Sequence, residues 1–310
     1  MPLYSSSRPN ALTFAIQHTR HFTVIGTLIA ASLVLRLNYE TAKGGYEQSL
    51  SLRFEGGPSS EPGRIAAVIN TAKMGTGGLS QNFINSWGCE EGIRDPLYLT
   101  YNCPNEGIVV RAHQIEGGVQ AVKKHRQEHP EGKCLIVTAI RSPKPWLPSL
   151  YVQQKGVCEN ISMTKEEMLQ DYKHWLSDVN NIVTAFDDCI PRLLQEFNGG
   201  SLVEQAKVMD HNNGYSILES TSSDSVFAGC ELLFLRMEQH DRWPEIIETM
   251  IPGNKFYEGK SRATQCPELA DHISMLQEYE LTNDEKMTIY TNGGPSVVDW
   301  FDTYGYIQME

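Results

Sequence analysis

The chain has 310 residues, a formal net charge of −12, and 40% hydrophobic and 21% charged residues. This length and apolar content allow one large domain or two small ones with a sizeable core. The acidic balance argues against a general nucleic-acid binder.

The seven cysteines lack CxxC pairs and His-rich spacing, so they indicate neither a zinc site nor a thioredoxin motif. Their number suits a secretory-pathway domain with one to three disulfides, whose pairing the spacing leaves open. Cys134 lies in an apolar run, and we expect it to be a buried free thiol.

The first 62 residues read as a membrane anchor with its flanks. Residues 1–21 contain two arginines and no acidic residue, and we interpret them as a cytoplasmic tail. Residues 22–37 are almost uncharged and predict a signal-anchor transmembrane helix, short beside the ~20 residues that span an average bilayer. Residues 38–62 are rich in Gly, Ser, Glu and Pro, as in a stem. A cleaved signal peptide and a buried core helix are the alternatives for residues 22–37.

A strand, a glycine loop and a helix follow one another at the start of the globular domain, which we place at residues 63–310. Residues 64–70 form an apolar run typical of a buried strand, and residues 79–87 carry apolar side chains at helical spacing. The glycines between them leave the first helical N–H groups accessible to an anion, and Lys73 adds a cation. The pattern predicts a phosphate cradle for a nucleotide-like ligand, and an ordinary βα turn is the alternative.

The rest of the domain predicts an α/β fold. We expect an irregular excursion over 89–107, and a long helix or a helix pair over 164–197, broken near Pro191. His125 and His129 occupy helix positions that we expect to face solvent. Further strands are predicted at 108–112, 133–140 and 231–236, and helices at 115–129, 241–250, 268–279, 286–291 and 296–304, with capping boxes beginning at Thr164 and Thr282.

Three of the predicted strands end on basic residues. Strands that alternate with helices favour a parallel sheet, which binds ligands at the carboxyl ends of its strands. Lys73, His113 and Arg141 each lie just past such an end, so we expect them to share one site. Ser149 follows Arg141 on the next predicted helix, and an arginine fork with a hydroxyl can hold a second phosphate.

The two segments together resemble the sulfotransferase superfamily. Arg141 and Ser149 are similar to its 3′-phosphate motif, although Ser142 replaces the usual acidic residue. Residues 234–238 and 279–290 are similar to the membrane-anchored, carbohydrate-directed branch, which includes proteins of capsular polysaccharide synthesis. The residues similar to the 5′-phosphosulfate loop of the family are Lys73, Gly75, Thr76, Gly77, Gly78 and Leu79.

The resemblance implies a P-loop-like, three-layer αβα fold with a central parallel sheet. It also implies 3′-phosphoadenosine 5′-phosphosulfate as the donor, no metal, and a glycan hydroxyl as the acceptor. Lys73 would stabilise the leaving phosphate and His113 would be the base, with Glu116 as the alternative base. A loop with Lys255, Lys260 and Arg262 is expected to be solvated, with closure over the 3′-phosphate as the alternative.

The implied location is the Golgi membrane, as a single-pass type II protein with a luminal catalytic domain, or secretion if the N-terminal segment is cleaved. The glycosylation sequon at Asn160 fits a luminal domain.

The loop also departs from the family pattern. Gly77 and Gly78 stand where the family usually has hydroxyl residues that contact the 5′-phosphate. This departure keeps open a catalytically lapsed relative that binds glycans or partners. A sugar or lipid kinase is the other alternative, although no Gly-Lys-[Ser/Thr] follows the glycines as in a Walker loop.

Overall fold

The computed structural model describes residues 62–71, 73–156, 163–186, 189–212, 214–220, 225–250 and 269–306. The predicted tail and anchor, nearly all of the predicted stem, and Asn160 lie outside these residues. Within the described ranges, no helix has the length and apolar content needed to cross a membrane.

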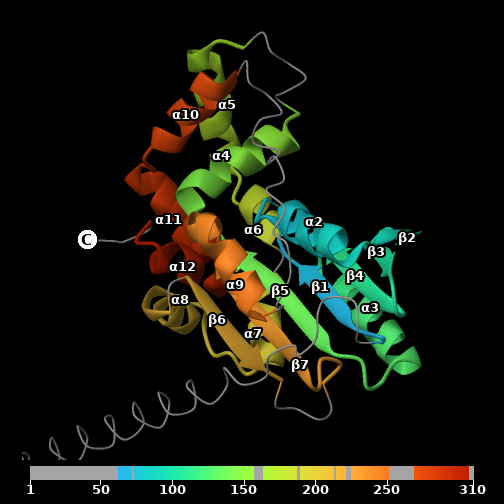
Figure 1. Cartoon of the computed structure of the whole chain (residues 1–310). Helices are drawn as coiled ribbons and strands as arrows, with labels where there is room; N and C mark the ends of the chain where they lie inside the picture. Colours follow the sequence, from blue (N-terminus) through green and yellow to red (C-terminus); the bar gives the residue numbers. More distant parts are fainter. Residues whose placement is uncertain are drawn as a thin grey trace, which may run out of the picture. The chain divides into compact units, whose positions relative to one another are not determined.

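A seven-stranded sheet forms the centre of the domain, in the order β2-β3-β4-β1-β5-β7-β6 (Figure 1). Its four central strands are parallel, whereas β2, β3 and β6 add antiparallel pairs at the two sides. The domain is an α/β fold with a central sheet, as expected, and this sheet is mixed, because antiparallel strands flank its parallel centre. The strands are β1 (Ile65–Ile69), β2 (Glu90–Arg94), β3 (Tyr98–Cys103), β4 (Gly107–Ala112), β5 (Cys134–Ile140), β6 (Tyr215–Glu219) and β7 (Cys230–Arg236).

Helices cover both faces of the sheet. Every residue of β1 and of β5 is buried, which is why both strands are continuous apolar runs without alternation. On one face, Ala66 and Val68 pack with α2 (Thr76–Trp87) and α9 (Trp243–Met250). On the other face, alternate residues of β1 pack with α3 (Ile115–Glu128) and with most of the remaining helices.

The predicted capping boxes are confirmed in the remaining helices, whereas the helix break expected near Pro191 is wrong. Thr164 and Thr282 both form capping boxes with a glutamate three residues later. Pro191 does not break a helix, because it lies in the first turn of α7, where a proline is tolerated. These helices are α4 (Pro143–Gln154), α5 (Lys165–Ser177), α6 (Asn180–Phe186), α7 (Cys189–Glu196), α8 (Leu202–His211), α10 (Ala270–Glu278), α11 (Asn283–Asn292), α12 (Gly294–Thr303) and the 3₁₀ helix η2 (Met237–Arg242).

The segment 89–107, expected to be irregular, is a β-hairpin formed by β2 and β3. β2 is exposed along most of its length, so its sequence lacks the apolar alternation that marks a half-buried strand. Its order comes from pairing with β3 and from a disulfide between Cys89 and Cys103.

Two further expectations are wrong because of contacts between distant parts of the chain. Cys134 is not a free thiol but forms a disulfide with Cys230, directly opposite it in the β5–β7 register, with the Cα atoms 4.6 Å apart. His125 does not face solvent but is 6% exposed, with its Nε2 atom 2.8 Å from the Gly63 carbonyl oxygen.

Candidate anion-binding site

The glycine loop leaves β1 at the carboxyl edge of the sheet and is held by buried polar contacts. Asn70 Nδ2 donates to the Met74 carbonyl oxygen at 2.6 Å, and Thr138 Oγ1 donates to Asn70 Oδ1 at 3.4 Å. Lys73 and Gly75 have φ angles of 66° and 84°. A left-handed backbone at a lysine is uncommon, and such conformations cluster at ligand-binding sites.

The first turn of α2 presents unsatisfied donors at the end of this loop. Its N-cap residue, Gly75, has no side-chain cap, and the first internal bond runs from the Leu79 amide to the Gly75 carbonyl. The amides of Thr76, Gly77 and Gly78 have no hydrogen-bond partner among the described residues. Thr76 is only 3% exposed, and its Oγ1 atom also lacks a partner there. An anion would satisfy these donors and the positive end of the helix dipole.

Arg141 connects this loop to α4. Its Nη1 atom donates to Ser149 Oγ at 3.1 Å and lies 3.5 Å from the Lys73 carbonyl oxygen. Ser149 Oγ in turn donates to the Pro145 carbonyl at 3.0 Å. Lys73, Arg141 and Ser149 were all expected at the site from the sequence. Arg141 lies 68 positions and Ser149 76 positions after Lys73, and the fold brings the three residues into one cluster.

The charge of Arg141 is held in a mostly buried position. Burial lowers the pKa of its guanidinium, and the nearby Glu238 carboxylate opposes that effect. Glu238 also accepts a hydrogen bond from the Ser142 amide at 2.6 Å, and Trp300 Nε1 donates to the Arg141 carbonyl at 3.1 Å. Because an arginine stays protonated in proteins, Arg141 carries a fixed positive charge at this position.

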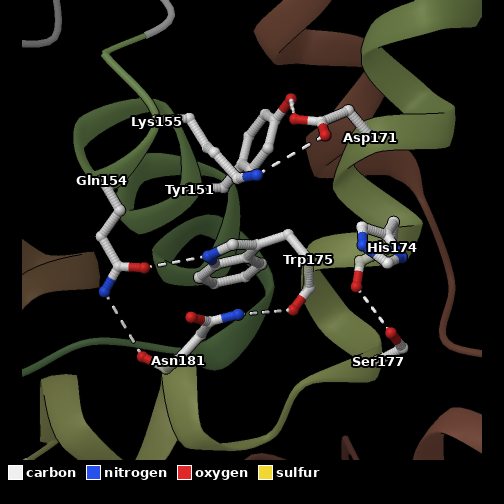
Figure 2. A network of polar contacts seen from close by, with 8 residues as sticks. All are labelled: Tyr151, Gln154, Lys155, Asp171, His174, Trp175, Ser177 and Asn181. Carbon is white, nitrogen blue, oxygen red and sulfur yellow. Dashed lines mark hydrogen bonds and ion pairs between the residues drawn. The ribbon is translucent and has the colours of Figure 1, made fainter.

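A polar network fixes α4, which carries Ser149, against α5 and α6 (Figure 2). Trp175 Nε1 donates to Gln154 Oε1 at 2.9 Å, and Asn181 Nδ2 donates to the Trp175 carbonyl at 2.9 Å. The Tyr151 hydroxyl donates to an Asp171 carboxylate oxygen at 2.8 Å, and burial and this contact raise the pKa of Tyr151. The position of Ser149 therefore depends on helices beyond its own.

The two candidate bases differ in their surroundings. His113 is exposed and follows Ala112, whose carbonyl accepts a bond from the Asn70 amide at 3.1 Å, so it lies at the same edge as the loop. Glu116 forms an ion pair with Arg192, and that hydrogen bond lowers the pKa of Glu116. A lowered pKa makes Glu116 a weaker base, which favours His113 of the two.

Arg111 is a neighbour of the loop that sequence reasoning missed. A Cβ atom placed on Gly77 would lie 3.6 Å from Arg111 Nη2, whereas one placed on Gly78 would have no heavy atom within 4 Å. The sequence feature that could have indicated Arg111 is its position as a cation near the end of the predicted strand 108–112, two residues before His113.

The loop with Lys255, Lys260 and Arg262 lies outside the described residues. Among the residues that are described, no group of three or more His, Cys, Asp or Glu side chains is placed to hold a metal ion. No family model matches the chain, and no curated protein or solved structure matches it either.

Proposed function

We propose that the protein is a sulfotransferase that moves a sulfuryl group from 3′-phosphoadenosine 5′-phosphosulfate to a hydroxyl of a carbohydrate. The observation that carries this proposal is the position of Arg141, which contacts both the glycine loop and Ser149. The loop offers amide donors for one phosphate, and Arg141 with Ser149 offers a fork and a hydroxyl for another. A nucleotide with phosphates on the 3′ and 5′ oxygens of its ribose matches two such neighbouring groups, and a P-loop-like αβα arrangement would supply both.

The proposed reaction is an in-line displacement at sulfur. The acceptor oxygen forms a bond to sulfur while the bond from sulfur to the bridging oxygen breaks, which releases adenosine 3′,5′-bisphosphate. Lys73 and the amides of the α2 first turn stabilise the charge that develops on the leaving phosphate. His113 takes the acceptor proton, a task that suits a group with an ordinary pKa of about 6.5.

The cysteines support a place in the secretory pathway. Two disulfides, Cys89–Cys103 and Cys134–Cys230, form in the described part of the chain, and structural disulfides persist mainly in oxidising compartments. We propose that the domain lies in the Golgi lumen behind an N-terminal type II anchor, with release if that segment is cleaved. Mass spectrometry of the mature N-terminus, and of the peptide that contains Asn160, tests both parts of this assignment.

Calorimetry with adenosine 3′,5′-bisphosphate tests the donor assignment. We expect the wild-type protein to bind it, and Arg141→Ala to weaken that binding more than it weakens binding of adenosine 5′-monophosphate. Lys73→Ala should abolish sulfate transfer to a panel of glycans while the far-UV circular dichroism stays unchanged. Lys144→Ala is the matched control, because Lys144 forms an ion pair with Glu280 on the surface. Absence of bisphosphate binding by the wild type would refute the proposal, and protection by a magnesium nucleoside triphosphate alone would favour a sugar or lipid kinase.

The missing hydroxyls at Gly77 and Gly78 favour a second candidate, a lapsed relative that binds its ligands without transfer. Bisphosphate binding without sulfate transfer to any acceptor in the panel would support this candidate over the enzyme.

A further inference from the structure

Arg111 brings a positive charge to the first turn of α2 from a separate strand. It is the fifth residue of β4, and Val109, two residues earlier on the same face, packs in the cluster that contains the apolar side chains of α2. A Cβ atom on Gly77 would lie 3.6 Å from Arg111 Nη2 and 3.9 Å from its Cζ. The guanidinium therefore lies against the backbone of this turn, in space that a larger side chain at residue 77 would need.

Without an anion, this arrangement is electrostatically unfavourable. The start of a helix carries a partial positive charge that favours carboxylates, yet the first turn of α2 has no acidic residue. The side chain of Arg111 is half-buried and forms no hydrogen bond or ion pair with a residue that the structure describes. Thr76 Oγ1, in the same turn, is buried without a partner among those residues. A guanidinium that reaches solvent and a buried hydroxyl, both without a partner among the described residues, lie together at one helix start, and they point to a bound anion.

We propose that Arg111 is a ligand of the 5′-phosphosulfate group and replaces the hydroxyl side chains that residues 77 and 78 lack. This inference rests on the proposed function and identifies what gives the glycine loop its affinity. A guanidinium offers several N–H donors in a planar fork that matches a phosphate, and it brings a full charge that a hydroxyl does not. A Cβ atom at residue 77 would make an ordinary van der Waals contact with the guanidinium, so alanine fits there, whereas a longer side chain would compete with Arg111 for the same space.

Two ligands that differ only in the 5′-phosphate test this role. Calorimetry compares adenosine 3′,5′-bisphosphate with adenosine 3′-monophosphate for the wild type, Arg111→Gln and Arg111→Lys. Arg94→Gln is the matched control, because it removes the same charge from an exposed position on β2. We expect Arg111→Gln to weaken bisphosphate binding by roughly 10- to 100-fold, the range for losing a charged hydrogen bond, and to leave monophosphate binding within about twofold. Arg111→Lys keeps the charge without the fork and should fall between the two.

A third ligand, inorganic pyrophosphate, separates failure of this inference from failure of the proposed function. Suppose that the wild type binds the bisphosphate. If Arg111→Gln then binds the bisphosphate equally well, or loses affinity for both nucleotides equally, the role of Arg111 is refuted and the proposed function stands. If the wild type binds pyrophosphate in an Arg111-dependent manner but not the bisphosphate, the proposed function is refuted and Arg111 remains the anion ligand. No binding of either ligand by the wild type refutes both. Circular dichroism of each variant distinguishes lost binding from lost folding.

Discussion

The two glycines at the ends of the loop, Gly75 and Gly78, should respond to the same substitution with opposite signs. Gly78 lies in the first turn of α2, without a positive φ and with no heavy atom within 4 Å of a new Cβ. Alanine there should stabilise the protein by about 0.5–1 kcal/mol, because it reduces the conformational freedom that glycine loses on folding.

Alanine at Gly75 meets two separate costs. The φ of 84° is left-handed, which costs an L-residue about 1–2 kcal/mol. A Cβ atom would also lie 2.6 Å from Met237 Sδ and 3.1 Å from the Trp243 ring. The methionine can move, but the ring is held by a hydrogen bond from Trp243 Nε1 to the Arg236 carbonyl at 3.1 Å. We therefore expect a loss of about 1–3 kcal/mol, the sum of backbone strain and displaced packing.

Urea unfolding of the wild type and both alanine variants measures this contrast as a shift of the midpoint at constant slope. The two variants should differ by about 1.5–4 kcal/mol, when the gain at residue 78 is added to the loss at residue 75. A neutral Gly75→Ala, or a Gly78→Ala that destabilises the fold, would show that the loop does not have the conformation described. Both variants retain the backbone amides, so Gly78→Ala should also keep its affinity for adenosine 3′,5′-bisphosphate.

Three further predictions concern stability. Replacing Cys134 and Cys230 together by alanine should lower the free energy of unfolding by up to about 4–5 kcal/mol, because the disulfide closes a loop of 96 residues; calorimetric melting checks this. Burial lowers the pKa of His125 in the folded state, so its contribution to stability is fully present above pH of about 6.5 and is lost as the pH falls through the lower folded value. His125→Gln should flatten the decline in denaturation midpoint between neutral and mildly acidic pH, and an unchanged decline would contradict this role of His125. Thr282→Ala removes a capping box and should cost about 1 kcal/mol in urea unfolding; an unchanged midpoint would contradict the cap.

Much of the framework follows from signals that are local in sequence. The buried strands β1 and β5 match the predicted runs, because burial on both faces requires continuous apolar side chains. The capping boxes at Thr164 and Thr282 were equally predictable, since each one uses side chains only three residues apart. The loop at Lys73 and its helix also follow from such short-range spacing.

What only the tertiary structure decided is the pairing of groups that are distant in sequence. β2 was missed because an exposed edge strand needs no apolar alternation, and its order comes from its partner strand. His125 is buried because the end of α3 packs against Gly63, which no helical period indicates. Arg141 meets the carbonyl of Lys73 because β5 lies beside β1, and sequence could propose that meeting only through the general behaviour of parallel strands. The position of Arg111 beside Gly77 depends on strand order and helix packing together, so no local sequence pattern indicates it.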